Sequence, residues 1–251
     1  MAVRRDYQVQ TNAAPPSTAG AVDYCPPRAA TRIGVTIATP AYMAMAVEAV
    51  RRWKLYSGLE AIILTSEPGV CWWAKYDLAS LLPGRQVCFF DADVHFVDHL
   101  PLDELWPDGV DLTAIADPGV HDPLAFPAPD CVNFHLDPAK YFNGGLWACD
   151  FSNPLLQAWM HHARTITLGV KAGTFPRWYD FGEQTALNIA AKMTGLRLGI
   201  LDPGWAFFHW AWQKGVLTHP NRVLGVHAAG YHGTAGKTTT LATLTAAYTK
   251  P

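Results

Sequence analysis

Apolar residues in the first part of the chain fall into two kinds of segment. Three short apolar runs, at 33–39, 61–65 and 86–90, predict buried strands. Between them, residues 41–56 and 72–82 repeat apolar side chains at helical spacing, and a glycine follows each repeat within a few positions. The order strand, helix, strand, helix, strand is typical of a mostly parallel central sheet with helices on both faces. The pattern therefore predicts an α/β protein.

The pattern continues less regularly in the second part of the chain. Apolar runs at 112–116, 146–149 and 197–201 predict further strands. Helical spacing returns over 152–163, where a proline stands near the first turn, and over 182–193. These elements can extend the same sheet and cover it further.

Three segments lack such a pattern. Residues 117–140 contain five prolines and predict a long surface loop of the kind that often carries function. The tail 237–248 is rich in threonine and alanine and fits either a helix or a strand. Residues 1–31 are rich in proline and alanine without amphipathic spacing, which predicts a loosely ordered leader before one domain over 32–251.

Composition narrows the classes of function. Half of the 251 residues are apolar, and the net charge of −2 gives no electrostatic basis for binding nucleic acid or an anionic membrane. We expect no transmembrane segment and no signal peptide, because no apolar stretch is long enough. The five cysteines are scattered without C-x-x-C spacing, which indicates free thiols and no zinc site. The expectation is a cytoplasmic enzyme, with peripheral attachment to a membrane left open.

The most informative segment is the third apolar run, which ends in Asp91-Ala92-Asp93. Side chains at i and i+2 of an extended segment point the same way, so the two carboxylates can converge. Carboxylate oxygens at the end of a buried strand suit Mg²⁺ or Mn²⁺ held together with a phosphate group. The plainer alternative is an aspartate that caps a turn.

Three further motifs follow the acidic pair. They are F-N-G-G at 142–145, G-E-Q-T-A-L-N at 182–188 and H-A-A-G at 227–230. With D-A-D at 91–93, this order resembles the nucleotide-sugar-dependent glycosyltransferases of the GT-A fold, most closely the family 8 and glycogenin-like group. The likeness extends over about residues 33 to 235.

The resemblance implies a single GT-A (Rossmann-like) domain, with a donor-binding half over 32–100 and an acceptor-side half over 101–251. It also implies a metal site in which Asp91, Asp93 and His227 hold Mn²⁺, or Mg²⁺, together with the diphosphate of the donor. His232 is a rival to His227 for this role, and an ordinary histidine is the alternative for both.

By the same resemblance, Gln184, with Glu183 beside it, is expected next to the transferred sugar as the catalytic pair. The family usually has aspartate where this chain has Glu183, and a helix cap is the alternative reading of the pair. The donor is further expected to contact Ala92, between the two aspartates, and a set of residues from five other segments: Thr39, Lys75, Asn143, Gly144, Gly145, Gly230 and Lys237.

Two of these positions carry alternatives. Lys75 could instead be an ordinary solvated lysine, and Asn143-Gly144-Gly145 could form an ordinary tight turn. Lys237 stands four places later than the lysine of the family motif, and the Pro-Trp that follows in the family is missing here.

The function implied is transfer of a hexose from a nucleoside-diphosphate sugar, expected to be UDP-linked, to a carbohydrate or other hydroxyl acceptor, with retention of configuration. Two alternatives stay open: a phosphohydrolase of the haloacid dehalogenase type, in which a strand also ends in D-x-D, and a catalytically silent nucleotide-sugar or carbohydrate-binding protein. An inverting enzyme would need a carboxylate base, for which Asp130, Asp150 and Asp180 are candidates.

The densely aromatic segment 204–212 is compatible with an acceptor platform. A core or a contact in a homo-oligomer is the more common explanation for such density.

Overall fold

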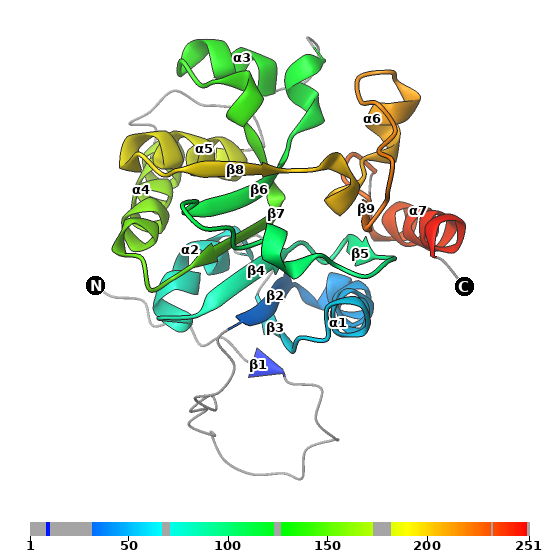
Figure 1. Ribbon diagram of the computed structural model, residues 1–251. Helices are drawn as coiled ribbons and strands as arrows, with labels where there is room; N and C mark the ends of the chain where they lie inside the picture. The colour runs from blue at the N-terminus through cyan, green and yellow to red at the C-terminus, as the bar shows by residue number, and fades with distance from the viewer. Residues whose placement is uncertain are drawn as a thin grey trace, which may run out of the picture.

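The computed structural model describes residues 9–10, 32–66, 71–122, 127–172, 182–231 and 233–249. Seven strands form one sheet in the order β1-β3-β2-β4-β7-β6-β8 (Figure 1). These strands are β1 (Val9–Gln10), β2 (Arg32–Ala38), β3 (Ala61–Thr65), β4 (Gln86–Phe90), β6 (Leu112–Ala116), β7 (Phe142–Asp150) and β8 (Leu198–Leu201). Only β1 and β7 run against the common direction of the other strands. The sheet is mostly parallel, and the predicted α/β class is confirmed.

Helices cover both faces of the sheet, as the sequence pattern predicts. Helices α2 (Cys71–Leu81), α4 (Pro154–Lys171) and α5 (Gly182–Thr194) pack on one face. Helix α1 (Met43–Ser57) packs on the other face together with the short helices η5 (Pro203–Ala206) and α6 (His209–Gln213). Part of the aromatic segment 204–212 thus belongs to the core, because Trp205, Phe207 and Phe208 are fully buried.

Strand β4 is apolar throughout because it is buried on both faces. Val87 and Phe89 face the core under α2 and α4, whereas Cys88 and Phe90 face the core under α1. Phe89 stacks on an indole of β7 with ring centroids 5.1 Å apart. Each buried phenylalanine stabilises the fold by about 2 kcal/mol, so the strand that precedes the acidic pair is firmly anchored.

Strand β7 is longer than the sequence pattern indicates. We expected a strand over 146–149, but β7 extends from Phe142 to Asp150 and pairs antiparallel with both β4 and β6. Asn143, Gly144 and Gly145 therefore lie within a strand and not in a tight turn. The pairing with β6 is irregular between Ala114 and Ala116, beside this segment. Glycines weaken the strand signal in a sequence, which explains why its first half is not visible there.

A second, two-stranded sheet lies beside the carboxyl end of β4. Strand β5 (Val94–Phe96) follows the acidic pair directly and pairs antiparallel with β9 (Gly225–His227). The tail that the sequence leaves undecided is helix α7 (Gly233–Tyr248), which packs on this small sheet through Leu241 and Leu244. This arrangement carries the C-terminal segment to the acidic pair.

The segment expected to be one long loop contains short helices. These are η3 (Pro118–His121), α3 (Pro127–Asn133) and η4 (Pro138–Lys140). The carboxylates of Asp117 and Asp137 cap η3 and η4 by accepting hydrogen bonds from the N–H two residues later. Of the expected leader, the structure describes only β1, and the remainder lies outside the described residues. Among the described helices, none combines the length and apolar character that crossing a membrane requires.

Candidate functional site

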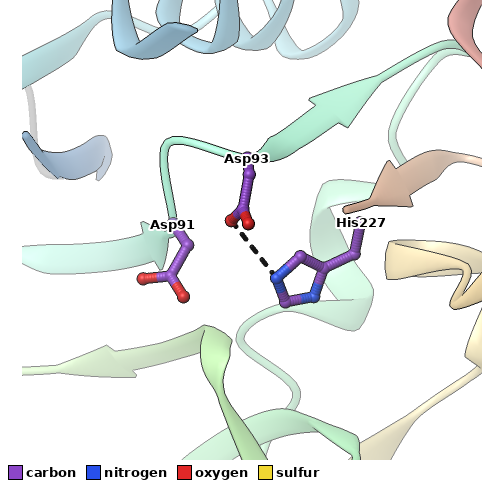
Figure 2. A group of neighbouring side chains, drawn as sticks. All are labelled: Asp91, Asp93 and His227. Atoms are coloured by element: carbon purple, nitrogen blue, oxygen red, sulfur yellow. Dashed lines mark ion pairs between the residues drawn. The ribbon is translucent and has the colours of Figure 1, made fainter. Parts of the chain in front are cut away.

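The acidic pair lies in a tight turn between β4 and β5. The Asp91 N–H donates to the Gly145 carbonyl of β7 (2.8 Å), and the Val94 N–H donates back to the Asp91 carbonyl (2.9 Å). Asp93 is 4% exposed, whereas the side chain of Asp91 is 37% exposed. The turn directs both carboxylates toward the space between β7 and β9 (Figure 2).

His227 reaches the same space from the end of β9. The register of the small sheet pairs Val94 with His227, and the Ala228 N–H donates to the Asp93 carbonyl (3.0 Å). His227 Nε2 lies 3.3 Å from Asp93 Oδ1, and the candidate ligand atoms of Asp91, Asp93 and His227 all lie within 4.8 Å of one another. Figure 2 shows the three side chains facing a common space. The metal-ligand set expected from the sequence is thus brought together.

The backbone leaves room for an ion at this point. A Cβ atom added to Gly145 would lie 2.6 Å from His227 Cε1 and 2.9 Å from Asp91 Oδ2, closer than such atoms can approach. Gly145 therefore allows β7 to pass directly beside the three side chains. Two carboxylates and an imidazole are a ligand set that suits Mn²⁺ and Mg²⁺. The residues present fit a divalent cation.

Lys75, Asp91 and Glu183 form a buried ionic group, here called the Lys75 cluster. Lys75 Nζ lies 2.7 Å from Glu183 Oε1 and 3.1 Å from Asp91 Oδ1, and it donates to the Gly144 carbonyl (3.2 Å). Burial favours the uncharged amine of Lys75, but the two carboxylates outweigh it and raise its pKa. Burial raises the pKa of Glu183, and the charge of Lys75 only partly opposes this rise. Lys75 is therefore not a solvated lysine.

A second ionic group, here called the Lys237 cluster, consists of Asp93, His227 and Lys237. Lys237 comes from the first turns of α7 and forms an ion pair with Asp93 Oδ2. Burial opposes ionisation of Asp93, but the neighbouring His227 and Lys237 outweigh it and lower its pKa. The Lys237 ammonium also lies 5.9 Å from the centre of the Tyr42 ring. Lys237 thus reaches the site despite its later position in the sequence.

A hydrogen-bond network fixes Gln184 and Asn143 beside the Lys75 cluster. The Gly144 N–H donates to Gln184 Oε1 (3.1 Å), and the Gly145 N–H donates to Asn143 Oδ1 (2.8 Å). The amide groups of Gln184 and Asn143 both donate to Asp117 Oδ2, at 2.8 and 2.9 Å. Sequence reasoning missed Asp117, although its place at the end of β6, next to β7, is the signal that could have indicated it.

Two adjoining cavities, of about 260 and 310 Å³, surround these groups. They share Lys75, Asp91, Asp93, Glu183 and Lys237. The smaller one adds Ile37, Thr39, Tyr42 and Ala92, and the larger one adds Asn143, Gly144, Gly145, Gln184, His227, Ala229 and Gly230. Every site residue expected from the sequence therefore lines one of the two cavities. Tyr42, which follows β2, is a lining residue that the sequence reasoning did not identify.

Two further candidates from the sequence, Asp130 and Asp150, lie away from the cavities. Asp130 accepts a hydrogen bond from the Thr185 hydroxyl (2.6 Å), and Asp150 accepts one from Gln86 at the opposite end of β4 from the acidic pair. Neither aspartate lines the two cavities. Asp180 and His232 are outside the described residues.

Comparison with known proteins shows what this fold is. No family model matches the chain, and no curated protein matches its sequence. Among solved structures, the galactosyltransferase LgtC, in complex with donor and acceptor sugar analogs, matches with a TM-score of 0.54 and 14% identity, covering 87% of this chain and 97% of LgtC. The chain has the GT-A fold.

Two further structures agree with the GT-A assignment. The bifunctional glycosyltransferase WbbM matches with a TM-score of 0.62 and 13% identity over 84% of this chain and 47% of its own. A glycosyltransferase involved in glycosylation of the major capsid of PBCV-1 matches with a TM-score of 0.54 and 14% identity over 83% of this chain and 98% of its own. The likeness extends over most of this chain, although little sequence identity remains.

Proposed function

We propose that this protein is a metal-dependent glycosyltransferase that moves a hexose from a nucleoside-diphosphate sugar, UDP-linked, to a hydroxyl acceptor with retention of configuration. The observation that carries the proposal is the convergence of Asp91, Asp93 and His227 within 4.8 Å, on the wall of a cavity that also contains Lys75 and Lys237. The GT-A fold, shared with structures named as glycosyltransferases, supports it.

Asp91, Asp93 and His227 would hold the divalent cation, Mn²⁺ or Mg²⁺. When bound, the ion offsets the negative charge that develops on the departing diphosphate. Lys237 pairs with Asp93 in the structure. A ligand that neutralises Asp93 would free the Lys237 ammonium to donate to the diphosphate. The side chain of Lys237 is already 21% exposed to solvent.

The sugar is assigned to the larger cavity, beside Gln184, Glu183 and Gly144. Lys75 holds the Glu183 carboxylate in place, and Asp117 orients the Gln184 amide. One of the similar solved structures, with a TM-score of 0.58 and 14% identity over 84% of this chain and 95% of its own, is a variant of LgtC in which an active-site glutamine is replaced by glutamate. This name supports a role for a glutamine in such a site, and we assign that role to Gln184, with Glu183 as its partner.

Retention follows from the motif resemblance to family 8 enzymes, and the donor contacts assigned to Thr39, Ala92, Asn143 and Gly230 rest on it as well. An inverting enzyme needs a carboxylate base beside the acceptor hydroxyl. Of the candidates for such a base that the structure describes, neither Asp130 nor Asp150 lines the cavities.

The direct test is release of UDP from UDP-glucose and UDP-galactose in the presence of Mn²⁺, with and without sugar acceptors. We expect release that a chelator abolishes and that Asp93→Asn lowers by about 10²- to 10³-fold, because the cation loses a ligand. Asp111→Asn is the matched control, since Asp111 is also a buried aspartate in an ion pair, with Arg197, away from the cavities.

Three results would contradict the proposal. Donor binding without turnover under any condition would favour a silent binding protein. Release of inorganic phosphate from a simple phosphoester would favour the phosphohydrolase. Full activity of Asp93→Asn in the presence of a chelator would show that the reaction does not require the metal site.

A further inference from the structure

A groove of about 560 Å³ is lined mainly by residues of α1 and α7, separate from the two cavities of the candidate site. It is larger than either of them. It shares no lining residue with them, and its walls are Ala44, Met45, Glu48, Arg52, His95, Thr238, Leu241, Ala242, Thr245, Ala246 and Thr249. Its volume is within the range of small-molecule sites, which lie at about 300–1,000 Å³.

Small side chains on α7 create this space. The helix packs on β9 and its neighbours through Leu241 and Leu244, which are buried. On its side toward α1, Ala242 and Ala246 are too short to fill the gap and remain exposed. Together with Met45 they give the groove a mostly apolar wall, which suits an apolar chain.

One end of the groove holds the guanidinium of Arg52 beside the carboxylate of Glu48. Arg52 donates through Nε to Glu48 (2.7 Å) and through Nη1 to the Phe96 carbonyl (3.2 Å). Glu48 also accepts two hydrogen bonds from Arg51, so two guanidinium groups share a single carboxylate. Within the described part of the chain, no hydrogen bond is found for Nη2 of Arg52, whose side chain is only 14% exposed. This leaves a cation with unused donors beside an apolar wall.

Threonine hydroxyls add further unused hydrogen-bonding capacity. Thr245 lines the groove and is 6% exposed, and its Oγ1 has no hydrogen-bond partner. Thr249 lies at the same end as Arg52, with its hydroxyl 3.5 Å from Nη1. A buried hydroxyl without a partner is unusual in a folded protein, and a ligand that carries an acceptor can satisfy it.

We infer that this groove is a binding site for an amphiphile with an anionic head and an unbranched apolar chain, such as a medium-chain carboxylate. The carboxylate accepts hydrogen bonds from Arg52 Nη2 and the neighbouring threonine hydroxyls. The chain lies along Met45, Ala242 and Ala246. Because Thr238 of the groove follows Lys237 directly, the occupant stabilises the helix that carries Lys237 into the candidate active site.

Decanoate, titrated below its micellar concentration and followed by calorimetry, tests the inference without any nucleotide sugar or metal. We expect saturable binding of one decanoate per chain, weaker binding of decan-1-ol and none of acetate. Ala242→Trp fills the groove and is expected to weaken decanoate binding by at least about tenfold. Ala247→Trp is the matched control, because Ala247 is an exposed alanine of the same helix outside the groove.

Each element of the inference has an outcome that overturns it. Circular dichroism first establishes that Ala242→Trp is folded. If this variant then binds decanoate as tightly as the wild type, decanoate binds elsewhere. If Arg52→Gln binds decanoate with unchanged affinity, or if decan-1-ol binds more tightly than decanoate, the groove does not recognise an anionic head. Hydrogen exchange over 238–249 is expected to slow on binding, and an unchanged rate there would exclude stabilisation of α7. None of these results depends on whether the protein transfers sugars.

Discussion

The two ionic clusters at the candidate site differ in how far their carboxylates are balanced by lysine. The Lys75 cluster sets one ammonium against the two carboxylates of Asp91 and Glu183. The Lys237 cluster sets one ammonium and an imidazole against the single carboxylate of Asp93. They face each other across one continuous space, because the two cavities share members of both.

The two clusters lie within a few ångströms of each other, yet this difference suits them to ligands of opposite charge. The carboxylate excess near Asp91 attracts a cation, and burial raises the pKa of Glu183. The Lys237 ammonium beside Asp93 favours an anion such as a diphosphate, and Lys237 and His227 together lower the pKa of Asp93. A metal–diphosphate ligand satisfies both clusters when it lies at their boundary.

The largest effect is expected from removing the two lysines one at a time. Lys75→Met leaves the buried carboxylate of Glu183 without its cation, together with the partly exposed Asp91, and should lower the free energy of unfolding by about 3 kcal/mol. Lys237→Met removes a more exposed cation and leaves His227 beside the buried Asp93 carboxylate, so the loss should be smaller, about 1 kcal/mol. Urea denaturation of both variants measures the difference. Equal losses would show that the clusters do not differ in this way.

The glycines of β7 test the space between the clusters. Gly145→Ala places a methyl group between His227 and Asp91, and we expect about a hundredfold loss of Mn²⁺ affinity, measured by calorimetry. Gly144→Ala is the matched control. Its added atom would meet nothing closer than 3.6 Å, so its affinity should be close to that of the wild type. A metal site untouched by Gly145→Ala would lie elsewhere.

A smaller effect is expected at Asp117, which touches neither lysine. Asp117→Asn presents an amide to the Gln184 and Asn143 donors and should lower turnover by about tenfold, with Mn²⁺ affinity unchanged.

Asp137→Asn is the matched control for Asp117→Asn. Asp137 caps η4 as Asp117 caps η3, by accepting from the N–H two residues later, but it takes no part in the network around Gln184. Loss of activity in both variants would mean that the cap matters and the network does not.

The sequence was informative where a local pattern determines structure. The buried strand before Asp91, the helices α1 and α2 and the α/β class all follow from hydrophobic spacing. The convergence of His227 on Asp91 and Asp93 came from resemblance to a family, because no local pattern indicates that β9 pairs with β5. Long-range pairing depends on packing that a single sequence does not display.

The remaining differences have physical causes. The first half of β7 contains Asn143, Gly144 and Gly145, a sequence typical of a turn. In the structure they are extended, and their backbone groups bond to Gln184 and Lys75 and to the Asp91 N–H. Asp117 resembled an ordinary turn residue because its Oδ1 does cap η3. Its Oδ2 accepts hydrogen bonds from side chains of β7 and α5, which are distant in the sequence. The helix α7 could not be assigned because threonine and alanine favour different structures.

The smallest effect expected is a pH dependence of opposite sign in the two clusters. The lowered pKa of Asp93 stabilises the fold above its ordinary value of 3.8, and this stability is lost as the pH falls below it. The raised pKa of Glu183 acts in the other direction, because the unfolded chain releases its proton near 4.5 while the folded chain retains it. Stability therefore declines as the pH rises from 4.5 toward the folded pKa.

Each of these two slopes has its own variant. Asp93→Asn should flatten the acid side of the stability curve, and Glu183→Gln should remove the decline above pH 4.5, when unfolding is measured by urea denaturation from pH 3 to 8. If both substitutions change the same side of the curve, the two carboxylates titrate as one group, and the division of the site into a cation-attracting and an anion-attracting cluster fails.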